Sequence, residues 1–220
     1  MNCLKEVLKL KVDRKSMLLY VVTDRSWLGQ NRLEQQVEET IRGGATFMQL
    51  REKEMSFEDF AAEARKIKEV TDRYGIPLVI NDDVQVALAV DADGIHVGQS
   101  DMACINVREL IGADKILGVS VQTVEQAILA EQQGADYLGV GAVFSTSTKN
   151  DADDVTRETL QAICKAVTIP VVAIGGIHEG NMRQLQGSGI DGVAVISAIF
   201  AKPDILAATK NLAAIAKEIF

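Results

Sequence analysis

The chain has 220 residues, the size of one domain, and its 47% hydrophobic and 25% charged side chains are typical of a soluble globular protein. Its 31 acidic and 23 basic residues give a net charge of -8, which argues against a nucleic-acid or anionic-membrane partner because phosphate surfaces require a basic face. The three cysteines are scattered without CxxC spacing, so we expect reduced thiols in the cytoplasm rather than disulfides or a zinc site.

Residues 1 to about 15 have the periodicity of an amphipathic helix, with Leu4, Val7, Leu8 and Val12 facing inward. This segment lacks the apolar core of a signal peptide, and no stretch approaches the length of a membrane span. We therefore expect an extra N-terminal helix and no membrane partner.

Eight short runs rich in Val, Ile and Leu then recur along the chain, as is typical of parallel strands covered by helices. The predicted strands are Leu18 to Thr23, Thr46 to Arg51, Pro77 to Asn81, Gly94 to Val97, Lys115 to Val119, Tyr137 to Gly141, Pro170 to Ile174 and Gly192 to Ile196.

Helical patterns lie between these runs. Ser56 with Asp59, and Thr123 with Gln126, have capping-box spacing ahead of apolar stripes, and glycine turns such as Gly43-Gly44 end the helices. Eight strand–helix pairs in 220 residues fit a closed barrel better than a doubly wound sheet. The sequence predicts one α/β domain over residues 1–220, a (β/α)8 TIM barrel.

In such a barrel the chemistry lies at the carboxyl ends of the strands, where the βα loops converge. Polar residues collect at these predicted ends. The segments concerned are Gln49-Leu50-Arg51-Glu52-Lys53, Asn81-Asp82-Asp83, Gly98-Gln99-Ser100-Asp101, Gly118-Val119-Ser120, Phe144-Ser145-Thr146-Ser147-Thr148-Lys149, Gly175-Gly176 and Ile196-Ser197.

Their chemistry indicates phosphorylated ligands. Arg51, Lys53 and Lys149 are cationic donors suited to phosphate oxygens. Asp82 and Asp101 are hard oxygen ligands of the kind that Mg²⁺ takes when it also binds substrate phosphates.

A second anion site is predicted at another part of the same face. Thr146 and Thr148 supply hydroxyls from a polar loop, and Gly175-Gly176 allows a backbone amide to approach a ligand. The loops after strands seven and eight often hold a phosphate in these barrels. The pattern therefore suggests a diphosphate and a separate phosphate in one pocket.

Simpler explanations exist for each element alone. Arg51 and Lys53 could form surface ion pairs with Glu52, and Asp82 and Asp83 could cap the next helix. It is the convergence of all these polar segments on one face that favours the functional interpretation.

The histidines and serines are not read as a catalytic pair. His96 is expected to be a hydrogen-bonded interior group, and His178 to open the helix after strand seven. Because Ser120 and Ser197 have no adjacent histidine and no GxSxG motif, we reject a serine nucleophile.

Taken together and in order, the motifs resemble those of the thiamine phosphate synthase family from about Leu18 to Lys210. The matching segments are YVVTDR near the start, GGATFMQLREK at 43–53, INDD at 80–83, DGIHVGQSDM at 93–102, LGVSVQT at 117–123, STSTKND at 145–151, AIGGI at 173–177 and GVAVISAIF at 192–200.

The resemblance implies a Mg²⁺-dependent transferase that joins a pyrimidine methyl diphosphate to a thiazole ethyl phosphate and releases pyrophosphate. Pyrophosphate departure leaves a pyrimidine carbocation, which the thiazole nitrogen attacks; such a step needs no general base. The residues implied for the pyrimidine diphosphate are Gln49, Arg51, Lys53, Asn81, Ser120 and Lys149; those for the metal are Asp82 and Asp101; those for the thiazole phosphate are Thr146, Thr148, Gly176, Ile196 and Ser197.

Arg51, Lys53, Lys149 and Ser120 are the expected catalytic residues, and Leu50, Glu52 and Ser147 complete the expected substrate-binding segments.

Three other functions stay open: a related thiazole tautomerase, a phosphosugar isomerase or epimerase, and a non-catalytic protein that binds the thiazole phosphate. The sequence leaves the oligomeric state open and is compatible with a homo-oligomer.

Overall fold

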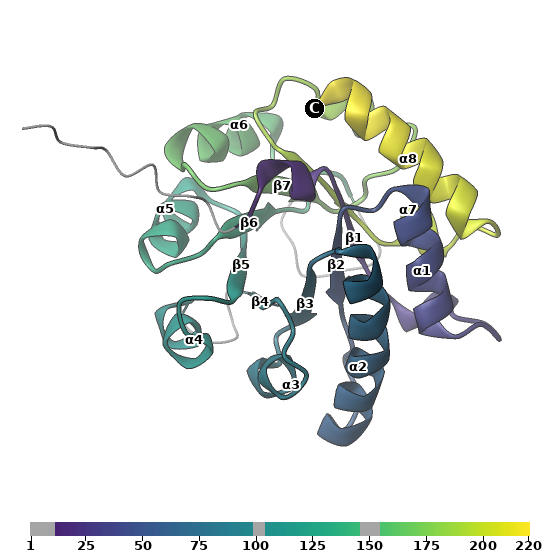
Figure 1. Cartoon of the computed structure of the whole chain (residues 1–220). Helices are drawn as coiled ribbons and strands as arrows, with labels where there is room; N and C mark the ends of the chain where they lie inside the picture. The colour runs from purple at the N-terminus through teal and green to yellow at the C-terminus, as the bar shows by residue number, and fades with distance from the viewer. Residues whose placement is uncertain (1–11, 99–103, 146–154) are drawn as a thin grey trace, which may run out of the picture.

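Eight parallel strands close into a barrel in the computed structural model, which describes residues 12–98, 104–145 and 155–220 (Figure 1). Each strand pairs with its neighbours in sequence, and β1 pairs with β8 to close the ring. The strands are β1 (Leu19–Val22), β2 (Phe47–Leu50), β3 (Leu78–Asn81), β4 (Gly94–Val97), β5 (Ile116–Val121), β6 (Tyr137–Val140), β7 (Val171–Ile174) and β8 (Gly192–Val195). The predicted (β/α)8 barrel is confirmed.

Helices surround the barrel. The α-helices are α1 (Leu33–Gly43), α2 (Phe57–Tyr74), α3 (Val84–Ala89), α4 (Cys104–Ile111), α5 (Val124–Gln132), α6 (Arg157–Ala166), α7 (Ser197–Phe200) and α8 (Ile205–Ile219), and the 3-10 helices are η1 (Arg14–Met17), η2 (Arg25–Trp27) and η3 (Met182–Leu185). Among the helices of the described ranges, none is both long and apolar enough to cross a membrane.

Alternation along the strands divides the core into two parts. Tyr20, Phe47 and Tyr137 point into the barrel, where they pack edge-to-face with ring centroids 4.8–5.8 Å apart. Leu19 and Val21 point the other way and join the larger apolar layer between strands and helices. The barrel interior is therefore a packed core up to its rim.

The predicted helix ends are confirmed. Ser56 caps α2 by accepting a bond from the Asp59 amide, and Thr123 and Gln126 form a reciprocal capping box at the start of α5. Gly44 ends α1 in the left-handed conformation, φ +108°, which a side chain rarely adopts.

Two expectations about helices are wrong. The described end of the predicted N-terminal helix, Val12 and Asp13, is not helical, because Asp13 instead caps the 3-10 helix η1. The predicted residues 1–11 lie outside the described ranges. After β7 the chain forms a turn and then η3, so His178 does not open an α-helix.

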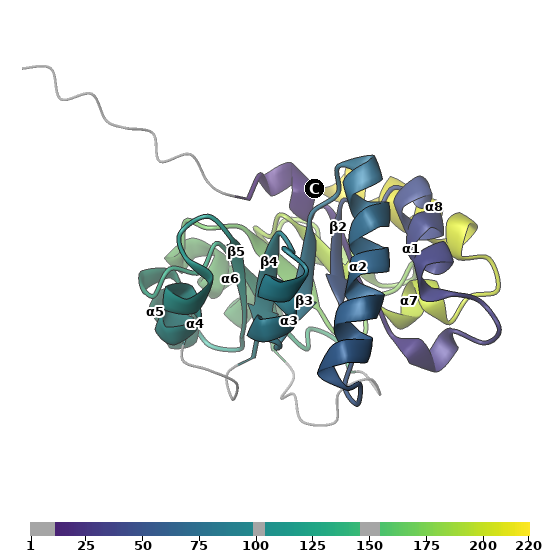
Figure 2. The same ribbon diagram turned by 60° about the horizontal axis from the view of Figure 1, so that its bottom comes forward.

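η1 lies across the amino-terminal end of the barrel, the end near the C-terminus in Figure 2. The Arg14 guanidinium binds the Asp191 carboxylate at 2.7 Å and also donates to the Thr168 carbonyl. Asp191 and Thr168 precede β8 and β7 respectively, so this end is fastened by structural contacts. The predicted site residues within the described ranges lie at the opposite, carboxyl end of the strands.

Candidate functional site

The carboxyl end of β2 is tied to β1 by backbone and side-chain bonds. The Thr23 amide donates to the Gln49 carbonyl at 3.0 Å, and the Arg51 amide donates to Thr23 Oγ1, also at 3.0 Å. Thr23 is fully buried, so the backbone of Arg51 is fixed at the rim while its side chain is only half-buried. Lys53, two residues further on, is exposed.

Gln49 and Leu50 point to opposite faces of β2. Gln49 is buried inside the barrel, and its Nε2 donates to Tyr20 Oη at 2.5 Å. Leu50 is fully buried in the apolar layer beneath the helices. Any contact between Leu50 and a ligand would therefore have to use its backbone.

Glu52 is paired with Arg25 of η2, a residue that the sequence reasoning did not select. Arg25 Nε donates to Glu52 Oε1 at 2.9 Å, and the Glu52 side chain is 5% exposed. Burial raises the pKa of Glu52 and the Arg25 guanidinium opposes that rise. The pair fixes the loop after β2 and leaves Arg51 and Lys53 outside the pairing.

Replacing Arg25 with alanine is expected to lower the free energy of unfolding at neutral pH by about 1 kcal/mol, a modest loss because Arg25 is 38% exposed. Without the guanidinium the folded-state pKa of Glu52 rises further, so the loss should shrink as the pH falls and Glu52 is protonated. Urea unfolding in neutral and mildly acidic buffer measures both values. Arg32→Ala, which removes a more exposed pair with Glu34, is the matched control. An Arg25→Ala loss that does not depend on pH would contradict this account.

Two consecutive aspartates at the end of β3 have different surroundings. Asp83 caps α3, since its Oδ1 accepts from the Val86 amide at 2.8 Å. Asp82 is exposed, has a left-handed φ of +63°, and accepts a hydrogen bond from Asn81 Nδ2. The capping explanation therefore applies to Asp83 only. A left-handed non-glycine residue costs about 1–2 kcal/mol and is enriched at functional sites.

Ser120 on β5 contacts His96 on β4 inside the barrel. His96 Nε2 lies 2.9 Å from Ser120 Oγ, and His96 is 7% exposed. The expectation of a buried, hydrogen-bonded His96 is confirmed, but the statement that Ser120 has no neighbouring histidine is wrong, because the two are adjacent in space and 24 residues apart in sequence. His96 Nδ1 lies 2.9 Å from Tyr137 Oη, so within the described ranges a tyrosine stands where a serine triad has its carboxylate.

The ends of β7 and β8 form a second group at the same rim. Gly175 and Gly176 have φ of +101° and +63°, and a Cβ at Gly176 would lie 2.6 Å from the Ser145 carbonyl oxygen. Only glycine therefore lets the loop after β6 pack against this turn. Ile196 precedes α7, and the exposed Ser197 is its first residue.

Asn181 fixes the turn after β7 and was missed by the sequence reasoning. Its Nδ2 donates to the Gly176 carbonyl at 2.8 Å, and its Oδ1 accepts from the His178 amide at 2.8 Å. Asn181 is buried, as expected of a residue that supports a loop. Its position seven residues after β7 carries no motif by which spacing alone could identify it.

Strand register shows which predicted residues the fold brings together. Leu50 pairs with Ile80, and Asn81 pairs with His96, so the ends of β2, β3 and β4 are contiguous. β5, which carries Ser120, pairs with β4. β7 and β8 are also neighbours, so Gly176 and Ile196 follow adjacent strands. Five predicted residues fall outside the described ranges: Asp101, Thr146, Ser147, Thr148 and Lys149.

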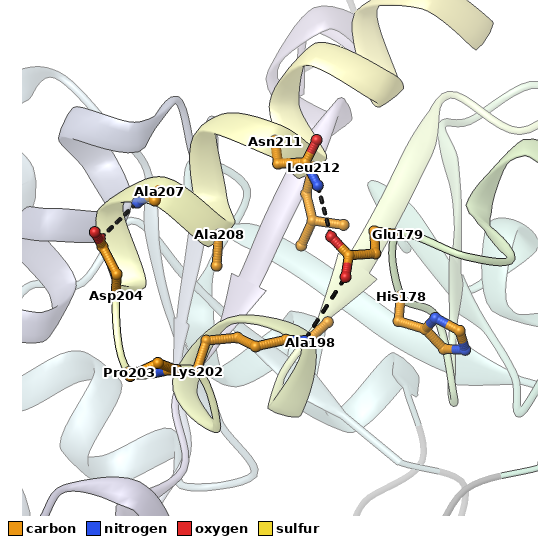
Figure 3. Close-up of a pocket in the computed structure, with 10 residues that line it drawn as sticks. All are labelled: His178, Glu179, Ala198, Lys202, Pro203, Asp204, Ala207, Ala208, Asn211 and Leu212. Atoms are coloured by element: carbon orange, nitrogen blue, oxygen red, sulfur yellow. Dashed lines mark hydrogen bonds and ion pairs between the residues drawn. The ribbon is translucent and has the colours of Figure 1, made fainter.

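A cavity of about 370 Å³ lies beside the β7–β8 group, between the turn after β7, α7 and the start of α8 (Figure 3). Glu179 accepts a bond from Asn211 Nδ2 at 2.7 Å and lies 3.8 Å from Lys202 Nζ. Ala198, which follows Ser197, also lines the cavity, but none of the predicted site residues that the structure describes does. The cavity therefore borders the candidate site and is separate from it.

The arrangement suits an anionic ligand held at two points. Half-buried Arg51 and exposed Lys53 provide cations at one side of the rim, close in the sheet order to Asn81 and Asp82. Glycine backbone and the Ser197 hydroxyl lie at the other side. Such a rim can bind phosphate groups at both sides and form hydrogen bonds to a polar ring between them.

Comparison with known proteins agrees with this geometry. The family model for thiamine monophosphate synthase matches residues 19–199. A thiamine-phosphate synthase of Clostridium beijerinckii is 52% identical over 205 residues, which cover 93% of this chain and 97% of that protein. A thiamine-phosphate synthase of Methanobrevibacter smithii is 48% identical over 201 residues, 91% and 96% of the two chains.

A solved structure supports the same assignment. The thiamine phosphate pyrophosphorylase from Pyrococcus furiosus superposes with a TM-score of 0.87 at 40% identity, and the match covers 94% of this chain and 98% of that one. Both the sequence match and the superposition span the strand ends where the candidate site lies. The chain therefore belongs to the thiamine monophosphate synthase family.

Proposed function

We propose that this protein is a thiamine phosphate synthase, a transferase that joins the pyrimidine methyl diphosphate to the thiazole ethyl phosphate with release of pyrophosphate. The observation that carries the proposal is the pair of anion-suited groups on one barrel rim, after β2–β5 and after β7–β8, in a chain of this family. Two phosphorylated substrates need two such groups in one pocket.

The proposed chemistry depends on stabilising the leaving group. Arg51, Lys53 and Lys149 bind the diphosphate and neutralise the charge that grows on it as the C–O bond breaks. The electrons of that bond leave with pyrophosphate, and the thiazole nitrogen then forms the new C–N bond to the pyrimidine methylene carbocation. Gln49, Asn81 and Ser120 orient the pyrimidine, so the nucleophile meets a fixed carbon.

The thiazole phosphate is proposed to bind at the other side of the rim, at Gly176, Ile196 and Ser197 together with Thr146 and Thr148. Asn181 donates to the Gly176 carbonyl and so fixes the backbone of this turn, which supports a backbone amide contact there. This arrangement keeps the second phosphate away from Arg51 and Lys53, the cations that follow β2.

Mg²⁺ is proposed to be held by Asp82 and Asp101. Asp82 fits this role, because its carboxylate is at the strand end, exposed, and on a left-handed backbone, while Asp83 is used for capping. When bound, Mg²⁺ would supply positive charge next to the diphosphate oxygens.

We also propose that the protein works in the cytoplasm on small-molecule substrates. The half-buried Cys164 supports a reduced, unreactive thiol, since burial raises its pKa to about 11. A homo-oligomer is compatible with this proposal.

The test is pyrophosphate release by the purified protein, with both substrates and Mg²⁺, then with either substrate omitted, and then with EDTA. Release that requires both substrates and the metal is expected. Isomerisation of a thiazole phosphate without the pyrimidine diphosphate would instead identify a tautomerase. Binding of the thiazole phosphate with no turnover would identify a binding protein.

A further inference from the structure

Five side chains form a continuous hydrogen-bonded chain across the inside of the barrel. Gln49 Nε2 donates to Tyr20 Oη at 2.5 Å, and Tyr20 Oη lies 2.8 Å from Tyr137 Oη. Tyr137 Oη lies 2.9 Å from His96 Nδ1, and His96 Nε2 lies 2.9 Å from Ser120 Oγ. The chain begins and ends on two residues of the proposed pyrimidine site, and its three middle members have no assigned role.

The barrel makes room for the middle of this chain with glycine. A Cβ at Gly118 on β5 would lie 2.1 Å from Tyr137 Cζ and 2.5 Å from His96 Nδ1. A Cβ at Gly139 on β6 would lie 3.2 Å from His96 Cε1. Tyr20 and Tyr137 are at most 1% exposed, although their hydroxyls carry polar atoms into an apolar core. Such groups are costly to bury unless they are bonded to one another.

A buried hydroxyl hydrogen without an acceptor is costly, so each tyrosine is taken to donate within the chain, which leaves two possible polarities. A tyrosine hydroxyl has one hydrogen, and a neutral imidazole has one donor and one acceptor nitrogen. If Gln49 Nε2 donates to Tyr20, then Tyr20 donates to Tyr137 and Tyr137 donates to His96 Nδ1. The proton of His96 is then on Nε2, which donates to Ser120 Oγ and directs the Ser120 hydrogen elsewhere. Reversing any one bond reverses all of them.

We infer that Tyr20, Tyr137 and His96 are positioning residues that couple the amide orientation of Gln49 to the donor direction of the Ser120 hydroxyl. This inference deepens the proposed synthase function and rests on it for the identity of the ligand. The coupling gives the pyrimidine site a fixed pattern of donors and acceptors on both sides of the ring before the substrate arrives. A preset pattern lowers the cost of binding and rejects rings with the opposite pattern.

Both tyrosine hydroxyls stay protonated, as the hydrogen-bonded chain requires. Burial raises the pKa of both Tyr20 and Tyr137 well above the usual tyrosine value. Both hydroxyls therefore keep their hydrogens throughout the neutral range, and the chain keeps one donor at each link.

The tautomer of His96 reports the polarity of the hydrogen-bonded chain. The protein has only two histidines, His96 and His178. In protein with ¹⁵N-labelled histidine, His178→Gln assigns the His96 signals. Wild type is expected to carry the proton on Nε2. In Gln49→Glu, in buffer alkaline enough to ionise the new carboxylate as read from its side-chain ¹³C shift, Tyr20 must donate to residue 49 and the proton of His96 is expected to move to Nδ1. The same tautomer in both proteins would overturn the inference.

A double variant separates transmission along the chain from a direct field effect. In Tyr20→Phe/Gln49→Glu the link is missing, so the change at residue 49 should no longer move the His96 proton relative to Tyr20→Phe alone. A tautomer change that persists without the Tyr20 hydroxyl would also overturn the coupling.

Steady-state kinetics test whether the hydrogen-bonded chain affects binding of the pyrimidine substrate. Tyr20→Phe is expected to raise KM for the pyrimidine diphosphate about 3- to 10-fold, the size of one hydrogen bond, with KM for the thiazole phosphate unchanged. Tyr74→Phe, which removes an exposed hydroxyl bonded to Glu38, is the matched control. Equal changes in both KM values would show a general structural role and overturn the positioning role. Absence of pyrophosphate release in wild type would refute the proposed function, while the tautomer measurement would still decide on the chain.

Discussion

Arg51→Ala is expected to lower kcat for pyrophosphate release by about 10²-fold or more, the scale of one lost donor to a developing charge. The Arg51 backbone is fixed by its bond to buried Thr23, so the guanidinium starts from a defined point at the rim. Its neighbour Glu52 is held by Arg25. Charge on the diphosphate grows as the C–O bond breaks, so the lost contact matters most in the transition state and kcat should fall more than affinity.

Two variants give this experiment its controls. Arg51→Lys keeps the charge but loses the planar, two-donor geometry of the guanidinium. Its kcat should lie between those of wild type and Arg51→Ala. Arg73→Ala removes an exposed arginine paired with Glu38 between α1 and α2, and should leave kcat and the melting temperature nearly unchanged. Wild-type kcat in Arg51→Ala would remove Arg51 from the catalytic group.

The barrel could be predicted because its signals are local. Short apolar runs, Ser56 and Thr123 at helix starts, and Gly44 at a helix end each depend on residues close in sequence, and all were found where expected. The missing helix after β7 shows the limit of this reasoning. There the turn is built around Asn181, whose side chain bonds the Gly176 carbonyl and the His178 amide. Nothing in the apolar pattern reveals these bonds.

The site was predicted less completely because its members meet only through the fold. His96 and Ser120 lie on the adjacent strands β4 and β5, and their contact depends on both side chains pointing into the barrel. Arg25 and Glu52 meet because η2 folds over the end of β2. The roles of Asp82 and Asp83 could not be separated by composition either, since backbone conformation alone distinguishes a capping carboxylate from one presented at the rim.

Asp82→Asn is expected to raise the Mg²⁺ concentration needed for half-maximal activity by about 10-fold or more, since a lost carboxylate ligand weakens a hard cation site. Asparagine is the appropriate replacement because it tolerates the left-handed φ of +63°. The melting temperature should therefore change little. Activity titrated with Mg²⁺ at saturating substrates gives the shift.

Asp83→Ala is the matched comparison, one residue along the chain. It removes the cap of α3 and should cost about 1 kcal/mol of stability while leaving the Mg²⁺ dependence as in wild type. The two variants are thus expected to differ in opposite ways. Asp82→Asn should change the Mg²⁺ dependence and leave the stability unchanged, whereas Asp83→Ala should lower the stability and leave the Mg²⁺ dependence unchanged. If both shifted the Mg²⁺ requirement equally, the effect would come from displacement of α3, and Asp82 would no longer be a proposed ligand. If neither did, the leaving group would be neutralised by the cationic side chains without help from this strand end.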